Sequence, residues 1–109
     1  MVVEKAYAKF HGSYEIIEGG WPDLCLRDLT GAPSYSYNND IEDAWEKIND
    51  GNKLNYVMVA ETKHDDILHN ISEYGLVAGH AYTLLGTATV QDSNGEEVQI
   101  VQLRNPWAH

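Results

Sequence analysis

The fold is decided towards the end of the sequence, where residues 79–107 read GHAYTLLGTATVQDSNGEEVQIVQLRNPW. Apolar and β-branched residues dominate 81–90 and 98–103, and this pattern predicts two strands. The segment Ser93-Asn94-Gly95-Glu96 between them predicts a tight hairpin, because Asn-Gly favours the positive φ angles of a type I′ turn. The two strands are therefore expected to pair antiparallel.

A two-residue turn at Asn94-Gly95 would fix the register and place Leu84 opposite Asn105. Residues that lie opposite each other share a face, and side chains alternate along a strand. His80 precedes Leu84 by four residues, so His80 and Asn105 are expected to point to the same side of the sheet. That offset still separates them by roughly 13 Å. Sheet twist, a wider loop or irregular pairing near Gly86 would have to close the gap.

The first third of the chain predicts one short helix and a long loop. Residues 2–11 carry apolar side chains at helical spacing, and Gly12 can end the helix in a left-handed cap. Residues 18–38 are rich in Gly, Pro, Ser and Asn and are expected to be loop, with a short helical turn near 23–29.

The middle of the chain predicts a helix followed by a buried strand. Residues 40–50 form the helix, capped by Asn39 or Asp40 and ended by Gly51. Residues 54–60 form the near-continuous apolar run of a buried strand. Residues 61–79 are ambiguous, with a helical turn expected near 65–71. Helices first and antiparallel strands last predict an α+β fold, mainly antiparallel sheet with a few short helices, in one domain over residues 1–109.

Composition excludes several classes of protein. Seven Lys and Arg stand against 17 Asp and Glu, which gives a net charge of −10. Such a chain is not expected to bind nucleic acid, because phosphate contacts need positive charge. No apolar stretch approaches the length of a membrane span. The single cysteine, Cys25, excludes an intrachain disulfide, and this favours a cytoplasmic, intracellular location.

Two separated motifs, Gly79-His80-Ala81-Tyr82 and Leu103-Arg104-Asn105-Pro106-Trp107, resemble the histidine and asparagine segments of papain-like cysteine peptidases. They are most similar to those of the calpain family. Residues 4–15, and Gly19-Gly20 followed by Leu29-Thr30-Gly31, also resemble calpains. The resemblance implies a papain-like half-domain, the second, C-terminal subdomain of a calpain-type protease core.

The resemblance also implies roles for three residues. In this family a cysteine thiolate attacks the peptide carbonyl, and an imidazole transfers the proton. His80 would be that imidazole, and Asn105 would orient it through its amide oxygen. Trp107 would cover the hydrogen bond between them and exclude water. A lone histidine at a strand end is usually only solvated, but two matching motifs favour the catalytic interpretation.

Other positions take their meaning from the same resemblance. Gly79 and Gly20 match glycines that let a peptide substrate approach the backbone closely, although either could be an ordinary turn glycine. The family's nucleophile lies in a Gly-Asp-Cys-Trp segment that this sequence lacks. Cys25, in Leu24-Cys25-Leu26, is expected to be a small apolar filler. The chain alone is therefore expected to be inactive, with a preceding Cys-bearing subdomain of the same protein as its partner and a protein or peptide as substrate.

No metal site is expected within the chain. His64 and His69 are five residues apart, which does not suit one helical face. Residues 92–95 lack the spaced acids of an EF-hand loop. Calcium dependence of the full-length enzyme is implied by the resemblance alone.

Two alternatives to a protease part stay open. One is a non-enzymatic calpain-like regulatory or binding module, and only the sequence of the nucleophile segment would decide between them. The other is an acidic interaction domain unrelated to peptidases, which would require both motif matches to be accidental. A structure with His80 and Asn105 on different sheets would favour the latter.

Overall fold

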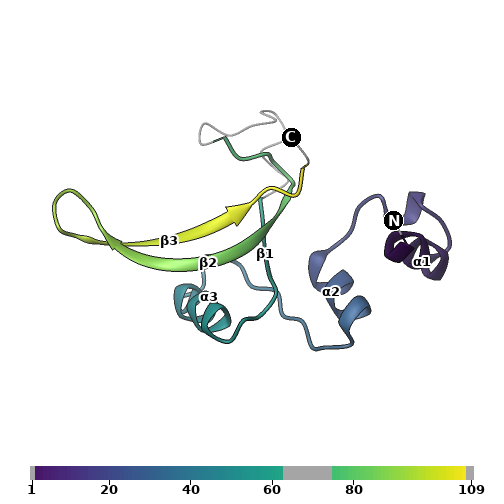
Figure 1. The fold of residues 1–109 in the computed structure, drawn as a ribbon, viewed down its shortest axis with the longest axis horizontal. Helices are drawn as coiled ribbons and strands as arrows, with labels where there is room; N and C mark the ends of the chain where they lie inside the picture. The colour runs from purple at the N-terminus through teal and green to yellow at the C-terminus, as the bar shows by residue number, and fades with distance from the viewer. Residues whose placement is uncertain (1, 63–74, 108–109) are drawn as a thin grey trace. The chain divides into compact units, whose positions relative to one another are not determined.

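The computed structural model describes residues 2–62 and 75–107. The chain divides into two compact units, Met1–Ser36 and Tyr37–His109. The described part of the first is helical, and that of the second combines a helix with an antiparallel sheet (Figure 1). The predicted α+β class is confirmed, and the assignment of residues 1–109 to one subdomain stays a prediction. Among the described residues, every helix is too short or too polar to cross a bilayer.

The first unit begins with the predicted helix. Helix α1 spans Val2–His11, and its end is set by Gly12, whose φ is 115°. The Gly12 amide donates to the Ala8 carbonyl over 2.8 Å, which closes the last turn. A short 3-10 turn, Glu15–Ile17, follows.

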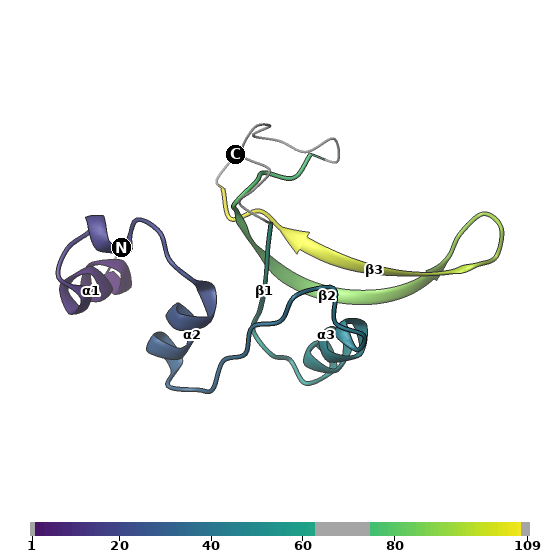
Figure 2. The ribbon, with the colours of Figure 1, turned by 180° about the vertical axis from the view of Figure 1, so that it is seen from behind.

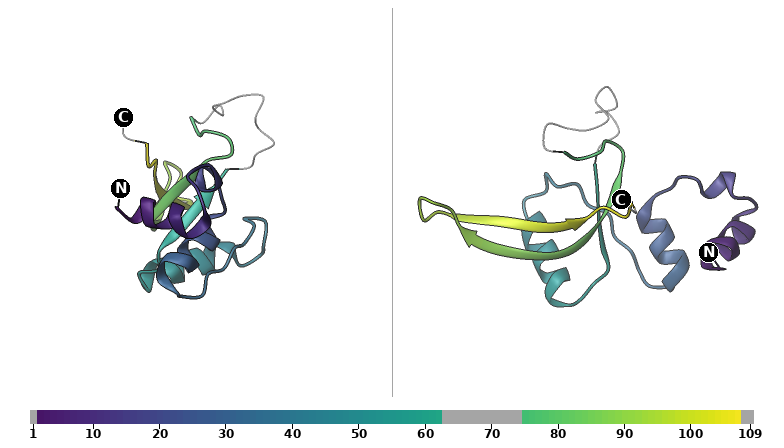
Figure 3. Two further views of the ribbon diagram at one scale, coloured as in Figure 1. Left: turned by 90° about the vertical axis from the view of Figure 1, so that its right-hand side faces the viewer. Right: turned by 45° about the horizontal axis from the view of Figure 1, so that its top comes forward.

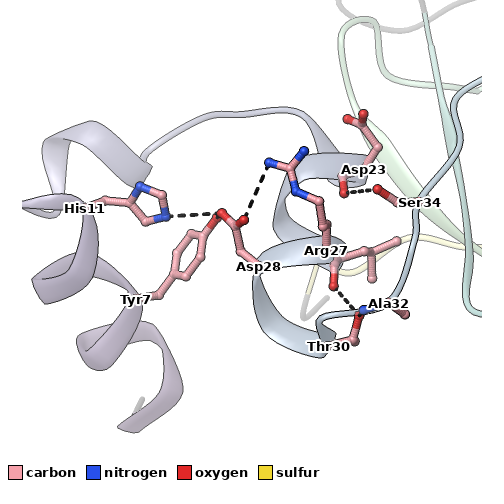
Figure 4. Close-up of polar contacts among 9 residues, drawn as sticks. Tyr7, His11, Asp23, Arg27, Asp28, Thr30, Ala32 and Ser34 are labelled. Atoms are coloured by element: carbon pink, nitrogen blue, oxygen red, sulfur yellow. Dashed lines mark hydrogen bonds and ion pairs between the residues drawn. The ribbon is translucent and has the colours of Figure 1, made fainter.

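The expected helical turn near residues 23–29 is a full helix. Helix α2 spans Pro22–Thr30, with Pro22 in its first turn, where a missing amide hydrogen costs nothing. Gly31, at φ 69°, ends the helix and donates its amide hydrogen to the Arg27 carbonyl. The Ser34 hydroxyl then ties the following chain back to the Asp23 carbonyl over 2.7 Å (Figure 4).

Asp28 joins the two helices of this unit. Its Oδ2 accepts a hydrogen bond from the Tyr7 hydroxyl (3.2 Å) and lies 3.4 Å from His11 Nε2. Figure 4 shows Tyr7 and His11 of α1 both directed at Asp28 of α2. Desolvation between the helices, together with the bond to Asp28, raises the pKa of Tyr7 to about 12.

The second unit holds a sheet in the order β1-β2-β3, with both pairs antiparallel. Its strands are β1 (Met58–Glu61), β2 (Ala81–Gln91) and β3 (Glu97–Arg104), of which β2 and β3 form one long curved hairpin (Figure 2). The two predicted hairpin strands are confirmed. The earlier strand begins later than expected, because Asn55 adopts φ 57° and Tyr56 donates its amide hydrogen to the Gly51 carbonyl.

The two-residue turn predicted for the hairpin is wrong. Gln91 pairs with Glu97, and the Asp92 amide donates to the Glu96 carbonyl, so the loop is wider by a residue. Asp92 causes the difference, since its Oδ1 accepts hydrogen bonds from the amides of Asn94 (2.8 Å) and Glu96 (2.9 Å). These bonds hold the pKa of the Asp92 carboxyl below its usual range.

A second shift of register lies within the hairpin. Leu84 pairs with Leu103 and Gly86 with Gln102, so Leu85 is an extra residue on β2. Such a bulge bends the strand and increases its twist. Leu84 therefore lies opposite Leu103 rather than the predicted Asn105, and continuing this register brings Asn105 opposite Tyr82.

Helix α3 spans Ala44–Lys53, later than predicted, and it runs through Gly51 rather than ending there. Gly51 is buried, and a Cβ atom at this position would lie 2.8 Å from the Met58 sulfur. The glycine thus permits close approach of α3 to β1. Asn49 and Asn52 both hydrogen-bond the Thr87 hydroxyl, which fixes α3 against β2 (Figure 3).

Among the described residues of this unit, the buried hydrophobic side chains lie on β2. Tyr82 is 5% exposed and Leu84 is 8% exposed. The opposite face of the hairpin carries Val90, Val98 and Ile100, each exposed to 40–44%. The helical turn expected near residues 65–71 lies outside the described residues.

Candidate active site

His80 lies immediately before β2, where the end of β1 holds its backbone. The Thr62 amide donates to the His80 carbonyl over 3.0 Å. The His80 amide in turn donates to the Thr62 hydroxyl over 2.9 Å. Both main-chain groups of His80 are therefore satisfied by one residue, and its side chain starts from a fixed position.

Asn105 lies immediately after β3, at the matching end of the hairpin. Pro106 follows it and disfavours helical backbone at Asn105, which keeps the chain extended. The Asn105 side chain then accepts the amide hydrogen of Trp107 at Oδ1 over 3.1 Å. This Asx turn fixes the orientation of the carboxamide and brings Trp107 back towards the strand ends.

The imidazole and the carboxamide are in contact. His80 Nε2 lies 2.9 Å from Asn105 Oδ1. An amide oxygen can only accept, so Nε2 carries the hydrogen. In the neutral ring the lone pair is then on Nδ1, which is the nitrogen able to take up a proton.

Two aromatic side chains enclose the imidazole. The Trp107 ring centroid lies 4.7 Å from that of His80, with the planes inclined by 50°. The Tyr82 ring meets the imidazole edge-on, at 4.8 Å and 85°. Trp107 is 50% exposed, so the group lies at the surface of this unit, where an imidazole can reach a molecule or segment that docks there.

Of the five residues predicted for the site, four come together. His80, Asn105 and Trp107 are in mutual contact, and Gly79 precedes His80 with φ 59°, a conformation that favours glycine. Gly20 belongs to the first unit, and a Cβ atom there would meet nothing within 4 Å. It is exposed and lies in the irregular stretch just before α2.

Thr62 and Tyr82 were not predicted as part of the site. Tyr82 anchors the segment before His80, because its hydroxyl accepts the Val77 amide hydrogen over 2.9 Å. The Gly-His-Ala-Tyr motif contained Tyr82 and could have suggested it. No signal in the sequence marked Thr62, which follows an apolar run and resembles any strand-end threonine.

Cys25, the only thiol, lies on α2 in the first unit. It is partly buried and interacts with Tyr7 across the two helices. Within residues 2–62 and 75–107, no three His, Cys, Asp or Glu side chains converge as ligands for a metal ion.

Comparison with protein families gives a match over residues 1–109 to the calpain family of cysteine proteases. The chain belongs to the calpain family. The resemblance of its two motifs to calpain segments is thereby confirmed, and the chain is a calpain-like protease part.

Several calpains are similar to the chain over almost its full length. The calpain-type cysteine protease ADL1 of Oryza sativa subsp. japonica is 35% identical over 117 residues, which cover 99% of this chain. Calpain-9 of Mus musculus and calpain clp-1 of Caenorhabditis elegans are each 32% identical, over 97% and 99% of the chain. The chain spans only 5%, 16% and 14% of these three calpains.

Proposed function

We propose that this chain supplies the catalytic histidine and its orienting asparagine to a calpain-type cysteine endopeptidase. His80 is the general acid and base, and Asn105 and Trp107 hold it in place. The single observation that carries the proposal is the 2.9 Å bond from His80 Nε2 to Asn105 Oδ1, against which Trp107 packs. The nucleophilic thiol comes from a preceding subdomain of the same protein.

One nitrogen, His80 Nδ1, carries the proton transfers in this proposal, and the hydrogen bond from Nε2 to Asn105 Oδ1 supports that choice. His80 Nδ1 takes the proton of the incoming thiol, and the thiolate forms a bond to the substrate carbonyl carbon. The imidazolium then returns the proton to the leaving amine as the peptide bond breaks. Water hydrolyses the resulting thioester with the same imidazole as base. Throughout, Nε2–H remains hydrogen-bonded to Asn105 Oδ1, and this bond keeps Nδ1 directed at the reacting atoms.

Asn105 suits this role because its carboxamide is neutral. It orients the imidazole without adding a negative charge that would hold the proton on the ring. Trp107 shields one side of the bond from water, which strengthens the interaction. Gly79, next to His80, leaves room for a peptide backbone, and Gly20 is a second candidate for such contact in the complete enzyme.

Exposed apolar side chains on the β2–β3 hairpin support the presence of another polypeptide segment packed against this unit. Val90, Val98 and Ile100 lie on the hairpin face opposite Thr87, and all three are substantially exposed. Apolar side chains grouped on one face are typical of surfaces that another polypeptide segment covers.

Calcium dependence and an intracellular location of the full-length enzyme are inferred from the family resemblance.

The proposal predicts that the isolated chain hydrolyses no peptide, because Cys25 does not serve as nucleophile. The measurement is cleavage of a fluorogenic peptide by the 109-residue chain and by the full-length protein that contains it. Turnover is expected only from the latter. Turnover by the isolated chain that disappeared on Cys25→Ala would overturn this assignment, since the nucleophile would then lie on α2.

A further inference from the structure

The Thr62 hydroxyl makes hydrogen bonds to a short segment of the chain that ends at His80. Its hydroxyl oxygen lies 2.6 Å from the Val77 carbonyl oxygen and 2.9 Å from the His80 nitrogen. A hydroxyl has one hydrogen and two lone pairs, so it can donate to Val77 while it accepts from His80. The Thr62 side chain therefore hydrogen-bonds to both ends of the four-residue segment Val77–His80.

The rest of the segment has little freedom once those ends are held. The Val77 amide donates to the buried Tyr82 hydroxyl, so both main-chain groups of Val77 have partners. Gly79 makes the turn at φ 59°. The position of the His80 Cα atom is thereby set by Thr62 and Tyr82, which lie at the ends of neighbouring strands β1 and β2.

Placement of this backbone matters for the ring that it carries. The bond from Nε2 to Asn105 Oδ1 tolerates only small displacements, since a hydrogen bond weakens rapidly beyond about 3.2 Å. Asn105 is anchored separately, immediately after β3. A shift of the segment relative to β3 would therefore lengthen the bond and turn Nδ1 away from the thiol.

We propose that Thr62 is a positioning residue for His80, acting through its hydroxyl on the Val77–His80 segment. The catalytic relevance of this role rests on the proposed function, whereas the hydroxyl's hold on the segment does not. Valine has nearly the same shape as threonine but no hydroxyl, so Thr62→Val would leave the His80 amide without its acceptor. Serine retains the hydroxyl and loses only a methyl group.

The first test measures amide hydrogen exchange in the 109-residue chain. Thr62→Val is expected to speed exchange at His80 by roughly fivefold to tenfold, the effect of losing one hydrogen bond. Thr62→Ser is expected to restore the rate to within about twofold. The matched control is Thr89→Val, an exposed threonine on β2, which should leave His80 unchanged. An unchanged His80 rate in Thr62→Val, or equal rates in the Val and Ser variants, would overturn the proposal.

The second test separates positioning from catalysis in the full-length protein. Thr62→Val should lower kcat for a fluorogenic peptide by at least about fivefold, and Thr62→Ser should recover it. Wild-type kcat in Thr62→Val would refute a positioning role. If the wild-type protein itself shows no turnover, the proposed function fails, and the exchange rates alone still decide whether Thr62 holds His80.

Discussion

Replacing His80 with alanine is expected to lower peptide turnover by the full-length protein about 10³-fold, within the usual contribution of general acid–base catalysis. The imidazole is the group that deprotonates the thiol and protonates the leaving amine, so its loss affects both proton transfers. The measurement is kcat/KM for a fluorogenic peptide, with active sites counted by a thiol-reactive inhibitor.

A matched histidine variant gives the control. His11 lies on α1, and its described contacts are with Tyr7, Phe10 and Asp28. His11→Ala should therefore keep turnover within about threefold of the wild type. Turnover by His80→Ala within tenfold of the wild type would mean that another group transfers the proton.

Leu84→Ala is expected to destabilise the second unit by about 3 kcal/mol, as large-to-small changes at buried sites do. Leu84 is 8% exposed and pairs with Met58 and Leu103 on the two neighbouring strands. Its removal leaves a cavity at the centre of a small sheet. The measurement is the free energy of unfolding in urea, taken from the midpoint and slope of the transition.

Val90 on the same strand provides the comparison. It is 41% exposed, so Val90→Ala should cost less than about 1 kcal/mol. Equal destabilisation by the two variants would contradict a core centred on Leu84 and Tyr82.

The common facing of His80 and Asn105 could be predicted from the sequence although the predicted register was wrong. The wider loop after Asp92 shifts the pairing by one residue, and the bulge at Leu85 shifts it by another. Two one-residue shifts leave the alternation of side chains unchanged. They also bring Asn105 two residues closer to the position opposite His80. A wider loop and irregular pairing near Gly86 thus narrow the gap that a two-residue turn would leave.

The errors occurred where a local signal competed with a distant contact. Asn94-Gly95 favours a two-residue turn, but the Asp92 carboxylate accepts two loop amides and stabilises a wider one. Gly51 resembles a helix stop, yet it serves the approach of Met58, which is seven residues away. Propensity describes neighbours along the chain and carries no information about such packing.

Thr62 illustrates what the sequence could not indicate at all. Its importance arises from hydrogen bonds to Val77 and His80, fifteen and eighteen residues away. Nothing in its immediate neighbours distinguishes it from other threonines at strand ends. Only the folded arrangement of β1 beside β2 brings its hydroxyl to the segment before His80.

The central claim, that Asn105 holds the His80 ring against Trp107, is tested most directly by NMR of the 109-residue chain. Ring protons of His80 and Trp107 should show strong nuclear Overhauser effects, because the ring centroids are 4.7 Å apart. The imidazole nitrogen shifts should place the hydrogen on Nε2. Asn105→Ala should weaken the His80–Trp107 effects and broaden or shift both nitrogen signals. Absence of these effects in the wild type, or identical spectra for the His80 ring in Asn105→Ala, would contradict the account.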